Sequence, residues 1–179
     1  MKKKNILIFG GSGFLGSHVA DQLTEAGHKV TIIDQKSSPW INVKQKFFKA
    51  DITKSISYET ILKKNKIVFN FAAISDIETA NYLPVKTVET NVLSFVKLLE
   101  LCKKHKIKKF IQASTIYVSG DHGGFYKASK LSAETYLREF NRILGVKYCI
   151  LRYGTLYGPR SDLTNGLHAI IKKTLEKKK

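Results

Sequence analysis

Two residues in the second half of the chain have the types and spacing needed for proton transfer. Tyr126 and Lys130 stand four positions apart, so a helix would place both side chains on one face. A phenol has a pKa of about 10 and is a poor base at neutral pH. A neighbouring ammonium favours the phenolate and should lower that pKa. The pair therefore predicts a site that moves a proton to or from a hydroxyl group, and the lysine could also hydrogen-bond a ribose.

A glycine-rich loop near the start has the spacing of a phosphate-binding turn. Gly10, Gly13 and Gly16 follow an apolar run and open a segment of helical periodicity. In such loops glycines permit the tight turn, the approach of a pyrophosphate and close packing of helix on strand, while the helix N-terminus attracts phosphate. The G-x-x-G-x-x-G spacing alone is compatible with an ordinary strand-to-helix turn. Together with the Tyr–Lys pair, it favours a redox enzyme that binds a dinucleotide.

An acidic residue at the end of the second apolar run supports this interpretation. Asp34 stands eighteen positions after Gly16 (34 − 16), close to the ~20 expected for the acid that accepts the adenosine ribose hydroxyls. A carboxylate there repels a 2′-phosphate, so the sequence favours NAD over NADP. Lys36 lies two residues later and should partly offset the repulsion.

Polar and small residues follow three further apolar runs. Asp51 comes directly after the third run, and Ala72 and Ala73 follow the fourth. Ligands of open α/β sheets bind at the carboxyl ends of strands, so we expect these residues near the ligand. Ser114 and Thr115 end the run before Tyr126, and either hydroxyl could hold a substrate oxygen beside the phenol.

The pattern of apolar runs predicts the elements that must position these groups. Short β-branched and aromatic runs alternate with segments of helical periodicity, which is typical of an α/β fold with a doubly wound parallel sheet, the Rossmann fold. The expected strands span residues 5–9, 29–33, 46–49, 66–70, 108–113 and 147–151. The expected helices span residues 14–26, 55–64, 85–105 and 125–144.

The composition fits one globular domain with a strongly basic surface. The 179 residues carry 31 basic against 14 acidic side chains and a net charge of +17, and only four of the basic residues are arginine. We expect a lysine-rich surface that favours anionic ligands rather than a specific nucleic-acid site, which usually requires arginine; a dedicated polyanion site is the alternative. Cys102 and Cys149 lie in apolar segments, and no stretch approaches membrane-spanning length. A cytoplasmic location without membrane association is therefore expected.

Further segments give the chain a resemblance to a known family. Thr90-Asn91-Val92, the run from Phe125 to Glu134 and the run from Leu151 to Arg160 occur in order after the glycine loop. With that loop and the Tyr–Lys pair, they resemble the extended short-chain dehydrogenase/reductase family, in its NAD-dependent epimerase/dehydratase group. Members of that group modify nucleotide sugars.

The resemblance implies a set of site residues. It implies catalysis by Thr115, Tyr126 and Lys130, with Asn91 supporting the site. Ser114 stays an alternative to Thr115, because the motif can be aligned in two ways. The implied cofactor is NAD and the substrate a UDP-, dTDP- or GDP-sugar, with no metal. Similar proteins dimerise through helices equivalent to 85–105 and 125–144. The implied cofactor contacts are Gly10, Gly13, Phe14, Leu15, Gly16, Asp34, Asp51, Ile52, Ala72, Ala73, Asn91, Tyr126 and Lys130.

The chain also departs from the family pattern. Ser119 and Thr155 stand where tyrosine and asparagine are usual, and Thr115 and Tyr126 are only eleven apart (126 − 115), so the pocket should be more open there. The family continues far beyond the last matching segment. We therefore expect an NAD-binding Rossmann domain with the catalytic helix at 1–160, and at 161–179 the start of a substrate-binding region that is largely absent. Two interpretations stay open: an epimerase, dehydratase or reductase, or a non-catalytic NAD-binding sensor or scaffold.

Overall fold

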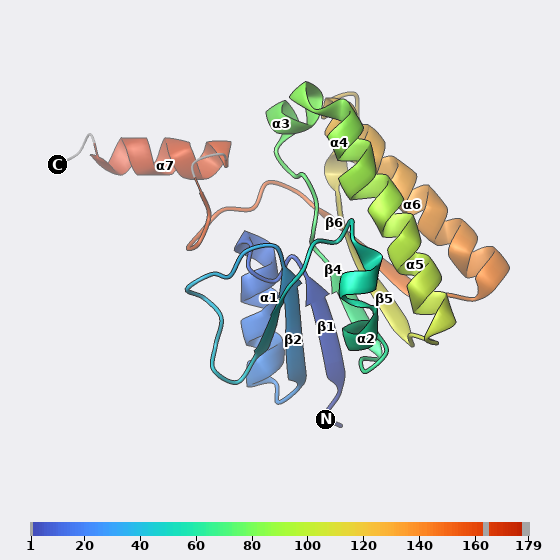
Figure 1. Ribbon diagram of the computed structural model, residues 1–179. Helices are drawn as coiled ribbons and strands as arrows, with labels where there is room; N and C mark the ends of the chain where they lie inside the picture. Colours follow the sequence, from blue (N-terminus) through green and yellow to red (C-terminus); the bar gives the residue numbers. More distant parts are fainter. Residues whose placement is uncertain (1, 163–164, 177–179) are drawn as a thin grey trace.

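A six-stranded parallel sheet forms the centre of the molecule (Figure 1). The computed structural model describes residues 2–162 and 165–176. The strand order is β3-β2-β1-β4-β5-β6, the doubly wound order whose direction reverses between β1 and β4, so the predicted fold is confirmed. The strands are β1 (Asn5–Phe9), β2 (Lys29–Asp34), β3 (Lys46–Lys49), β4 (Ile67–Asn70), β5 (Lys109–Thr115) and β6 (Tyr148–Tyr153).

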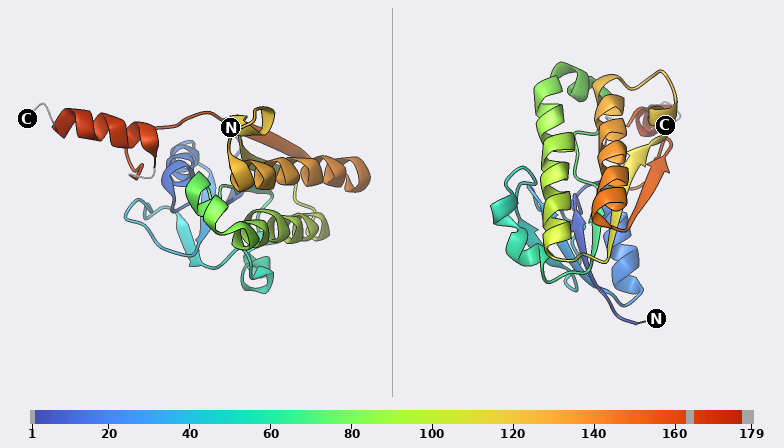
Figure 2. Two further views of the ribbon diagram at one scale, coloured as in Figure 1. Left: turned by 90° about the horizontal axis from the view of Figure 1, so that it is seen from above. Right: turned by 90° about the vertical axis from the view of Figure 1, so that its right-hand side faces the viewer.

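Helices cover both faces of the sheet. The helix α1 (Phe14–Glu25) lies on one face, and α5 (Ser94–Lys104) and α6 (Gly124–Leu144) lie side by side on the other (Figure 2). The helix α7 (Gly166–Glu176) projects away from the sheet. The shorter elements are η1 (Ser55–Ser57), α2 (Glu59–Leu62), α3 (Ile77–Tyr82), α4 (Pro84–Val88), η2 (Glu89–Leu93) and η3 (Ile116–Ser119).

The strand β1 explains why the apolar runs of this sequence are unbroken. Ile6 and Ile8 belong to the apolar cluster against α1, whereas Leu7 and Phe9 belong to the larger cluster that includes α5 and α6. All four side chains are at most 2% exposed. A central parallel strand is covered on both faces, so both sets of alternating side chains must be apolar.

The structure differs from the sequence prediction mainly along residues 85–105. One unbroken helix was expected there, and that prediction is wrong. The segment consists of α4, a π-helical turn η2 and α5, and Val88 is 54% exposed while Phe95 is buried. A π turn adds a residue to the helical turn, so the residues before it face a different direction.

The other differences lie at element boundaries. The strand β5 extends two residues beyond the expected range and includes Thr115. The segment 55–64 contains a 3₁₀ turn and a short helix rather than one helix, and α3 was not predicted. The expected division at residue 160 stays a prediction, and residues 163–164 and 177–179 of its second part lie outside the described residues.

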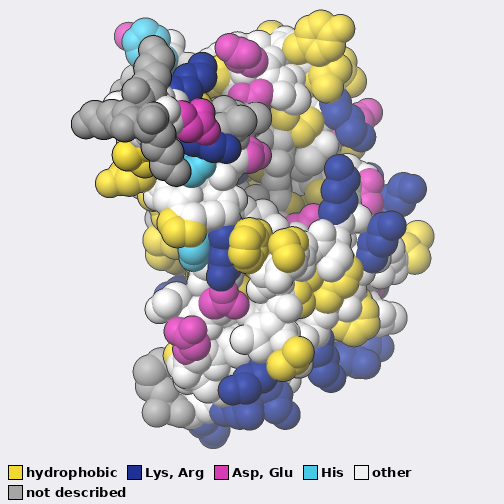
Figure 3. Space-filling model, turned by 90° about the vertical axis from the view of Figure 1, so that its left-hand side faces the viewer, with side chains coloured by type: hydrophobic (Ala, Val, Ile, Leu, Met, Phe, Trp, Pro, Cys, Tyr) yellow, Lys and Arg dark blue, Asp and Glu magenta, His cyan; other side chains and the backbone are white. Residues whose placement is uncertain are grey.

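Lysines mark the amino ends of the strands. The backbone N–H of Lys29 donates to the carbonyl of Lys4 at 2.9 Å, and that of Lys108 donates to Lys66 at 2.8 Å, so lysines of neighbouring strands stand next to each other. Basic side chains gather at this end of the molecule, the lower end in Figure 3. The end of the sheet that binds ligands in such folds is the opposite one, so these lysines lie away from it.

Within residues 2–162 and 165–176, no helix has the length and apolar character needed to cross a bilayer. Cys102 is buried and Cys149 is half-buried, and both are free thiols.

Candidate active site

A large pocket of about 1330 Å³ opens at the carboxyl ends of the strands. Its lining joins the glycine loop, the ends of β1, β2, β5 and β6 and the start of α6. The predicted site residues in the lining are Gly10, Gly13, Phe14, Leu15, Gly16, Asp34, Ile52, Ala72, Ala73, Ser114, Thr115, Tyr126 and Lys130. Asp51 and Asn91 do not line the pocket and lie behind residues that do.

Two glycines of the loop stand where the structure has room for backbone only. Gly10 has φ +75°, and a Cβ atom there would lie 2.6 Å from the backbone nitrogen of Ala72. A Cβ atom on Gly16 would lie 2.1 Å from the carbonyl oxygen of Gly10. The expected roles of these glycines in the turn and in helix–strand packing are therefore confirmed. Ser12 Oγ is buried in this loop and has no hydrogen-bond partner among the described residues.

Asp34 lies beside the glycine loop at the end of β2. Its Oδ2 atom accepts a hydrogen bond from the backbone N–H of Ser12 at 3.1 Å, and its Oδ1 atom accepts one from Lys36 N–H at 3.4 Å. The carboxylate is thus held at the pocket edge, next to the phosphate-binding turn. This placement is the one required of an acid that receives ribose hydroxyls.

Asp51 shapes the turn that presents Ile52 to the pocket. Burial raises the pKa of Asp51, but hydrogen bonds from the backbone and hydroxyl of Thr53, both at 2.8 Å, outweigh burial and hold the pKa below its usual value. The buried Tyr58 hydroxyl donates to the carbonyl of Ile52 at 3.1 Å. Asp51 therefore acts on the pocket through the loop it stabilises.

Asn91 connects the loop after β4 to the helix that carries Tyr126. Its Oδ1 atom accepts from Ile74 N–H at 2.8 Å, and its Nδ2 atom donates to the Ile74 carbonyl at 2.9 Å and to Ser129 Oγ at 2.9 Å. The side chain projects from the π-helical turn η2, an irregularity that often marks functional sites. The sequence motif identified Asn91, but its contacts become clear only in the structure.

Thr115, Tyr126 and Lys130 meet at one end of the pocket. The Thr115 side chain hydrogen-bonds Tyr126, and Lys130 Nζ lies 5.6 Å from the centroid of the Tyr126 ring. Lys130 Nζ also donates to the carbonyl of Ala113 at 3.0 Å. The lysine side chain is buried, and α6 presents both functional groups toward the end of β5.

The pKa of Tyr126 differs from the sequence expectation. Burial raises this pKa, and the hydrogen bond with Thr115 only partly offsets the effect. The expected net lowering of this pKa is therefore wrong for this structure. Burial also lowers the pKa of Lys130 to about 8, because an ammonium loses hydration in the interior.

Ser114 faces a different partner from its neighbour Thr115. Its hydroxyl is buried and donates to Glu134 Oε1 at 2.7 Å. Thr115 accepts a bond from Tyr117 N–H at 3.3 Å and also contacts Tyr126. The structure therefore brings Thr115, rather than Ser114, into contact with the phenol.

The unfolding free energy should depend on pH through Lys130. Between about pH 8, its pKa in the fold, and 10.5, its ordinary value, the unfolded chain binds more protons than the folded one. Stability must therefore rise with pH across this window, by roughly 3 kcal/mol for this shift. The free energies of unfolding of the wild type and of Lys130→Met can be compared by urea unfolding at several pH values. As the pH rises through this window, the wild type should gain stability relative to the variant. A difference that does not vary with pH would contradict the buried ammonium.

The pocket lining contains residues that the sequence interpretation missed. Ser12, Ser75, Glu78 and Tyr153 all border the cavity; Ser12 lies inside the recognised glycine motif, and Glu78 lies on the unpredicted helix α3. Among the described residues, no cluster of His, Cys, Asp or Glu could hold a metal ion.

The comparison with known proteins identifies the family. A family model described as the NAD dependent epimerase/dehydratase family matches residues 6–179. The chain belongs to the NAD-dependent epimerase/dehydratase family.

Individual members of the family resemble this chain over much of its length. The crystal structure of a UDP-glucose 4-epimerase from Thermotoga maritima with UDP-glucose is 34% identical, with a TM-score of 0.89 over 97% of this chain and 63% of that one. A Thermus thermophilus UDP-glucose 4-epimerase in complex with NAD is 28% identical, with a TM-score of 0.84 over 94% of this chain and 60% of that one.

A curated relative extends the comparison to another reaction. A dTDP-D-glucose 4,6-dehydratase from Dictyostelium discoideum is 31% identical over 88% of this chain and 45% of its own length. The chain thus spans about half the length of the curated relatives that it matches.

The residues of this epimerase/dehydratase-family pocket fit NAD. The ends of β2 and β5 are three strands apart, which is roughly 14 Å at the spacing of neighbouring strands. A ligand that reaches both Asp34 and Tyr126 must therefore be long, as a dinucleotide is. At the end of β1, next to Asp34, Gly10 and Gly16 leave no room for side chains. The Ser12 hydroxyl, unpartnered among the described residues, is a hydrogen-bonding group for a phosphate.

Proposed function

We propose that this chain binds NAD and forms the cofactor-binding and catalytic part of a nucleotide-sugar epimerase or dehydratase. The observation that carries the proposal is the shared pocket. Thr115, Tyr126 and Lys130 converge at one end of it, and Asp34 and the glycine loop lie at the other. When bound, NAD supplies the hydride acceptor and donor for the reaction.

The residues of the chain supply the proton chemistry. Tyr126, in the phenolate form, would accept the proton of a sugar hydroxyl and return it at the end of the cycle. Thr115 would orient that hydroxyl beside the phenol, since its side chain already contacts Tyr126. Lys130 would stabilise the phenolate by its charge, and its fixed position at the Ala113 carbonyl keeps it close to the ring. Burial of Tyr126 makes this charge necessary, because burial alone disfavours the phenolate.

A UDP-, dTDP- or GDP-sugar is the proposed substrate class. Support comes from the Thermotoga maritima and Dictyostelium discoideum relatives, whose names include UDP-glucose and dTDP-D-glucose. Ser119, Thr155 and the short segment between Thr115 and Tyr126 depart from the family pattern on the side of the pocket proposed for the sugar. The choice between epimerisation and dehydration therefore belongs to residues around this segment and beyond the Rossmann domain.

Titration calorimetry of the chain with NAD tests the cofactor part of the proposal. We expect the wild type to bind NAD more tightly than NADP, because the Asp34 carboxylate repels a 2′-phosphate. In Asp34→Ala the ratio of the two dissociation constants should move at least about ten-fold toward NADP, a change of 1.4 kcal/mol. The exposed Asp121→Ala serves as a control of equal charge and should leave the ratio unchanged. Absence of NAD binding by the wild type would refute the proposed function.

A non-catalytic NAD-binding sensor or scaffold is the second candidate. The assembled Thr115, Tyr126 and Lys130 cluster argues against it, because cofactor sensing needs no proton-transfer group. Calorimetry with UDP-glucose in the presence of NAD separates the two. Tight binding of NAD with no heat from the sugar nucleotide would favour the sensor.

We further propose that the protein is a cytoplasmic homodimer that contacts its partner through α5 and α6. The helix α6 carries exposed apolar side chains at Leu131, Tyr136 and Ile143, which a second copy could cover. Sedimentation velocity of the wild type and Tyr136→Lys should give a dimer and a monomer, respectively. A wild-type monomer at high concentration would argue against the dimer.

The free thiols Cys102 and Cys149 support a reducing compartment.

A further inference from the structure

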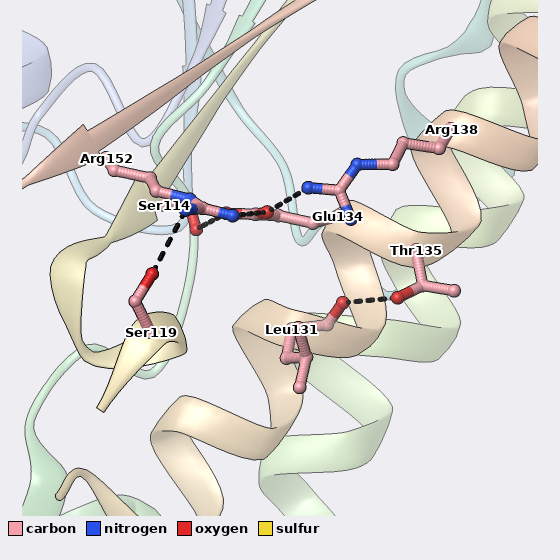
Figure 4. A network of polar contacts seen from close by, with 7 residues as sticks. All are labelled: Ser114, Ser119, Leu131, Glu134, Thr135, Arg138 and Arg152. Carbon is pink, nitrogen blue, oxygen red and sulfur yellow. Dashed lines mark hydrogen bonds and ion pairs between the residues drawn. The ribbon is translucent and has the colours of Figure 1, made fainter. Parts of the chain in front are cut away.

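A buried carboxylate joins the helix that carries Tyr126 to the strand that carries Thr115 (Figure 4). Glu134 is 0% exposed. It lies on α6 four residues after Lys130 and eight after Tyr126, so the three side chains share one face of the helix. Glu134 does not line the pocket, and any effect it has on a ligand must pass through other residues.

Hydrogen-bond donors saturate both oxygen atoms of Glu134. Oε1 accepts from Ser114 Oγ at 2.7 Å and from Arg152 Nε at 2.9 Å. Oε2 accepts from Arg152 Nη2 at 2.7 Å and from Arg138 Nη2 at 2.8 Å. A carboxylate offers about four acceptor sites, so all are filled. Burial raises the pKa of Glu134, but the bonds from Arg152 and Ser114 outweigh burial and hold the pKa below its usual value.

The network fixes α6 against the end of β5. Three consecutive strand residues are each attached to the helix, in the pairs Ala113–Lys130, Ser114–Glu134 and Thr115–Tyr126. Lys130 and Tyr126 line the pocket, whereas the ionised Glu134 does not. A shift of α6 along β5 would break all three pairs together.

Arg152 extends the network to two further elements. It projects from β6, and its Nη1 atom donates to Ser119 Oγ at 3.1 Å on the turn η3 that follows Thr115. Figure 4 shows Arg152 between Ser119 and Glu134. The strand end before Thr115 and the turn after it are therefore both tied to the same carboxylate, directly or through Arg152.

We propose that Glu134 is a positioning residue for the Tyr126 site: through Ser114 and Arg152 it sets the placement of Thr115 against the phenol and of α6 against β5. The proposal rests on the function proposed above. A neutral amide at position 134 would turn one acceptor into a donor that faces arginine or serine donors, and buried donors left without partners are costly. The strand end and helix would then separate, and Lys130 and Tyr126 would lose their alignment.

The effect should be confined to one end of the bound dinucleotide. Asp34 at the end of β2 lies roughly 14 Å from the end of β5, and the glycine loop at the end of β1 lies roughly 10 Å from it. ADP can occupy that half without reaching Tyr126. Misalignment of Lys130 and Tyr126 should therefore weaken NAD binding and leave ADP binding unchanged. A general loss of stability would instead weaken both ligands or neither.

The test compares the dissociation constants for NAD and ADP by titration calorimetry in Glu134→Gln and Arg152→Lys. Arg152→Lys keeps the charge but loses the two-pronged contact, and it provides an independent variant where Glu134→Gln fails to fold. Glu139→Gln is the matched control, because Glu139 lies on the same helix in an exposed pair with Arg142. Urea unfolding of each protein monitors the fold.

We expect NAD affinity to fall about ten-fold in both network variants, as the loss of one or two hydrogen bonds predicts. The affinity for ADP should stay within about two-fold of the wild type, and Glu139→Gln should match the wild type for both ligands. An unchanged ratio of NAD to ADP affinity in folded variants overturns the positioning role. A wild type that binds ADP and NAD equally, or binds neither, instead overturns the proposed function on which it rests.

Discussion

Gly16→Ala should produce a chain that has lost most of its NAD affinity and that is less stable than the wild type by about 1–3 kcal/mol or more. Two effects of this substitution have opposite signs. Alanine in a helix is favoured over glycine by about 0.5–1 kcal/mol, and Gly16 lies inside α1. The added Cβ atom, however, would lie 2.1 Å from the carbonyl oxygen of Gly10.

The steric effect should dominate because the obstacle is backbone. A side chain can rotate away from a close contact, whereas the Gly10 carbonyl is held by the turn and accepts a bond from Gly13 N–H at 3.2 Å. The helix N-terminus must therefore move away from β1. That movement displaces the N–H groups that would bind the pyrophosphate, so stability and NAD affinity should fall together.

Urea unfolding and NAD calorimetry of Gly16→Ala measure the two effects. Gly120→Ala is the matched control, because Gly120 has an ordinary φ of −125° and a Cβ atom added there would have no neighbour within 4 Å. The control should keep wild-type stability and NAD affinity. A Gly16→Ala protein as stable as the wild type would mean that helix and strand can separate without cost.

The centre of the sheet could be predicted from the sequence because its strands are short and apolar on both faces. β1 has no polar side chain between Ile6 and Phe9, and a segment of that length cannot be a stable helix on its own. Boundaries were less accurate. β5 continues to Thr115 because its last residues pair with β6, in the register Thr115 with Tyr153, and that pairing is a tertiary contact.

The helical segment 85–105 marks the limit of a periodicity argument. Helical periodicity over this range predicts an unbroken helix, but Asn91 bonds the loop at Ile74 and Ser129 on α6, and the π turn accommodates those contacts. The missed helix α3 did have a local signal. Asp76 caps it by accepting from Thr79 N–H at 2.9 Å, a pattern that an N-cap search would have found.

The candidate site was predicted to the level of residue types but not of electrostatics. Spacing on a helix sufficed to place Tyr126 and Lys130 together. The choice between Ser114 and Thr115 depended on a single residue of register, and the direction of the Tyr126 pKa depended on burial. Neither quantity is a property of local sequence.

In the proposed nucleotide-sugar reaction, Tyr126→Phe should lower the rate of turnover by about 10²–10⁴, the contribution of a positioned acid–base group. The phenol hydroxyl is the only part removed, and the ring stays to fill the same space. Only the hydrogen bond with Thr115 is lost, so the free energy of unfolding should change by no more than about 0.5–1.5 kcal/mol. NAD affinity should change little for the same reason. The measurement is chromatographic separation of UDP-glucose from UDP-galactose after incubation with the protein and NAD.

Tyr148→Phe provides the matched control for this variant, because Tyr148 begins β6, at the end of the sheet opposite the pocket, and does not line the pocket. It removes the same atom far from the pocket, and turnover should match the wild type. The combination expected of an acid–base residue is a large loss of rate with NAD affinity and stability retained. Equal rates in the wild type and Tyr126→Phe would remove the phenol from the reaction, and Thr115 and Lys130 would then serve only to bind. A parallel loss of rate and NAD affinity would instead assign the Tyr126 hydroxyl to cofactor binding.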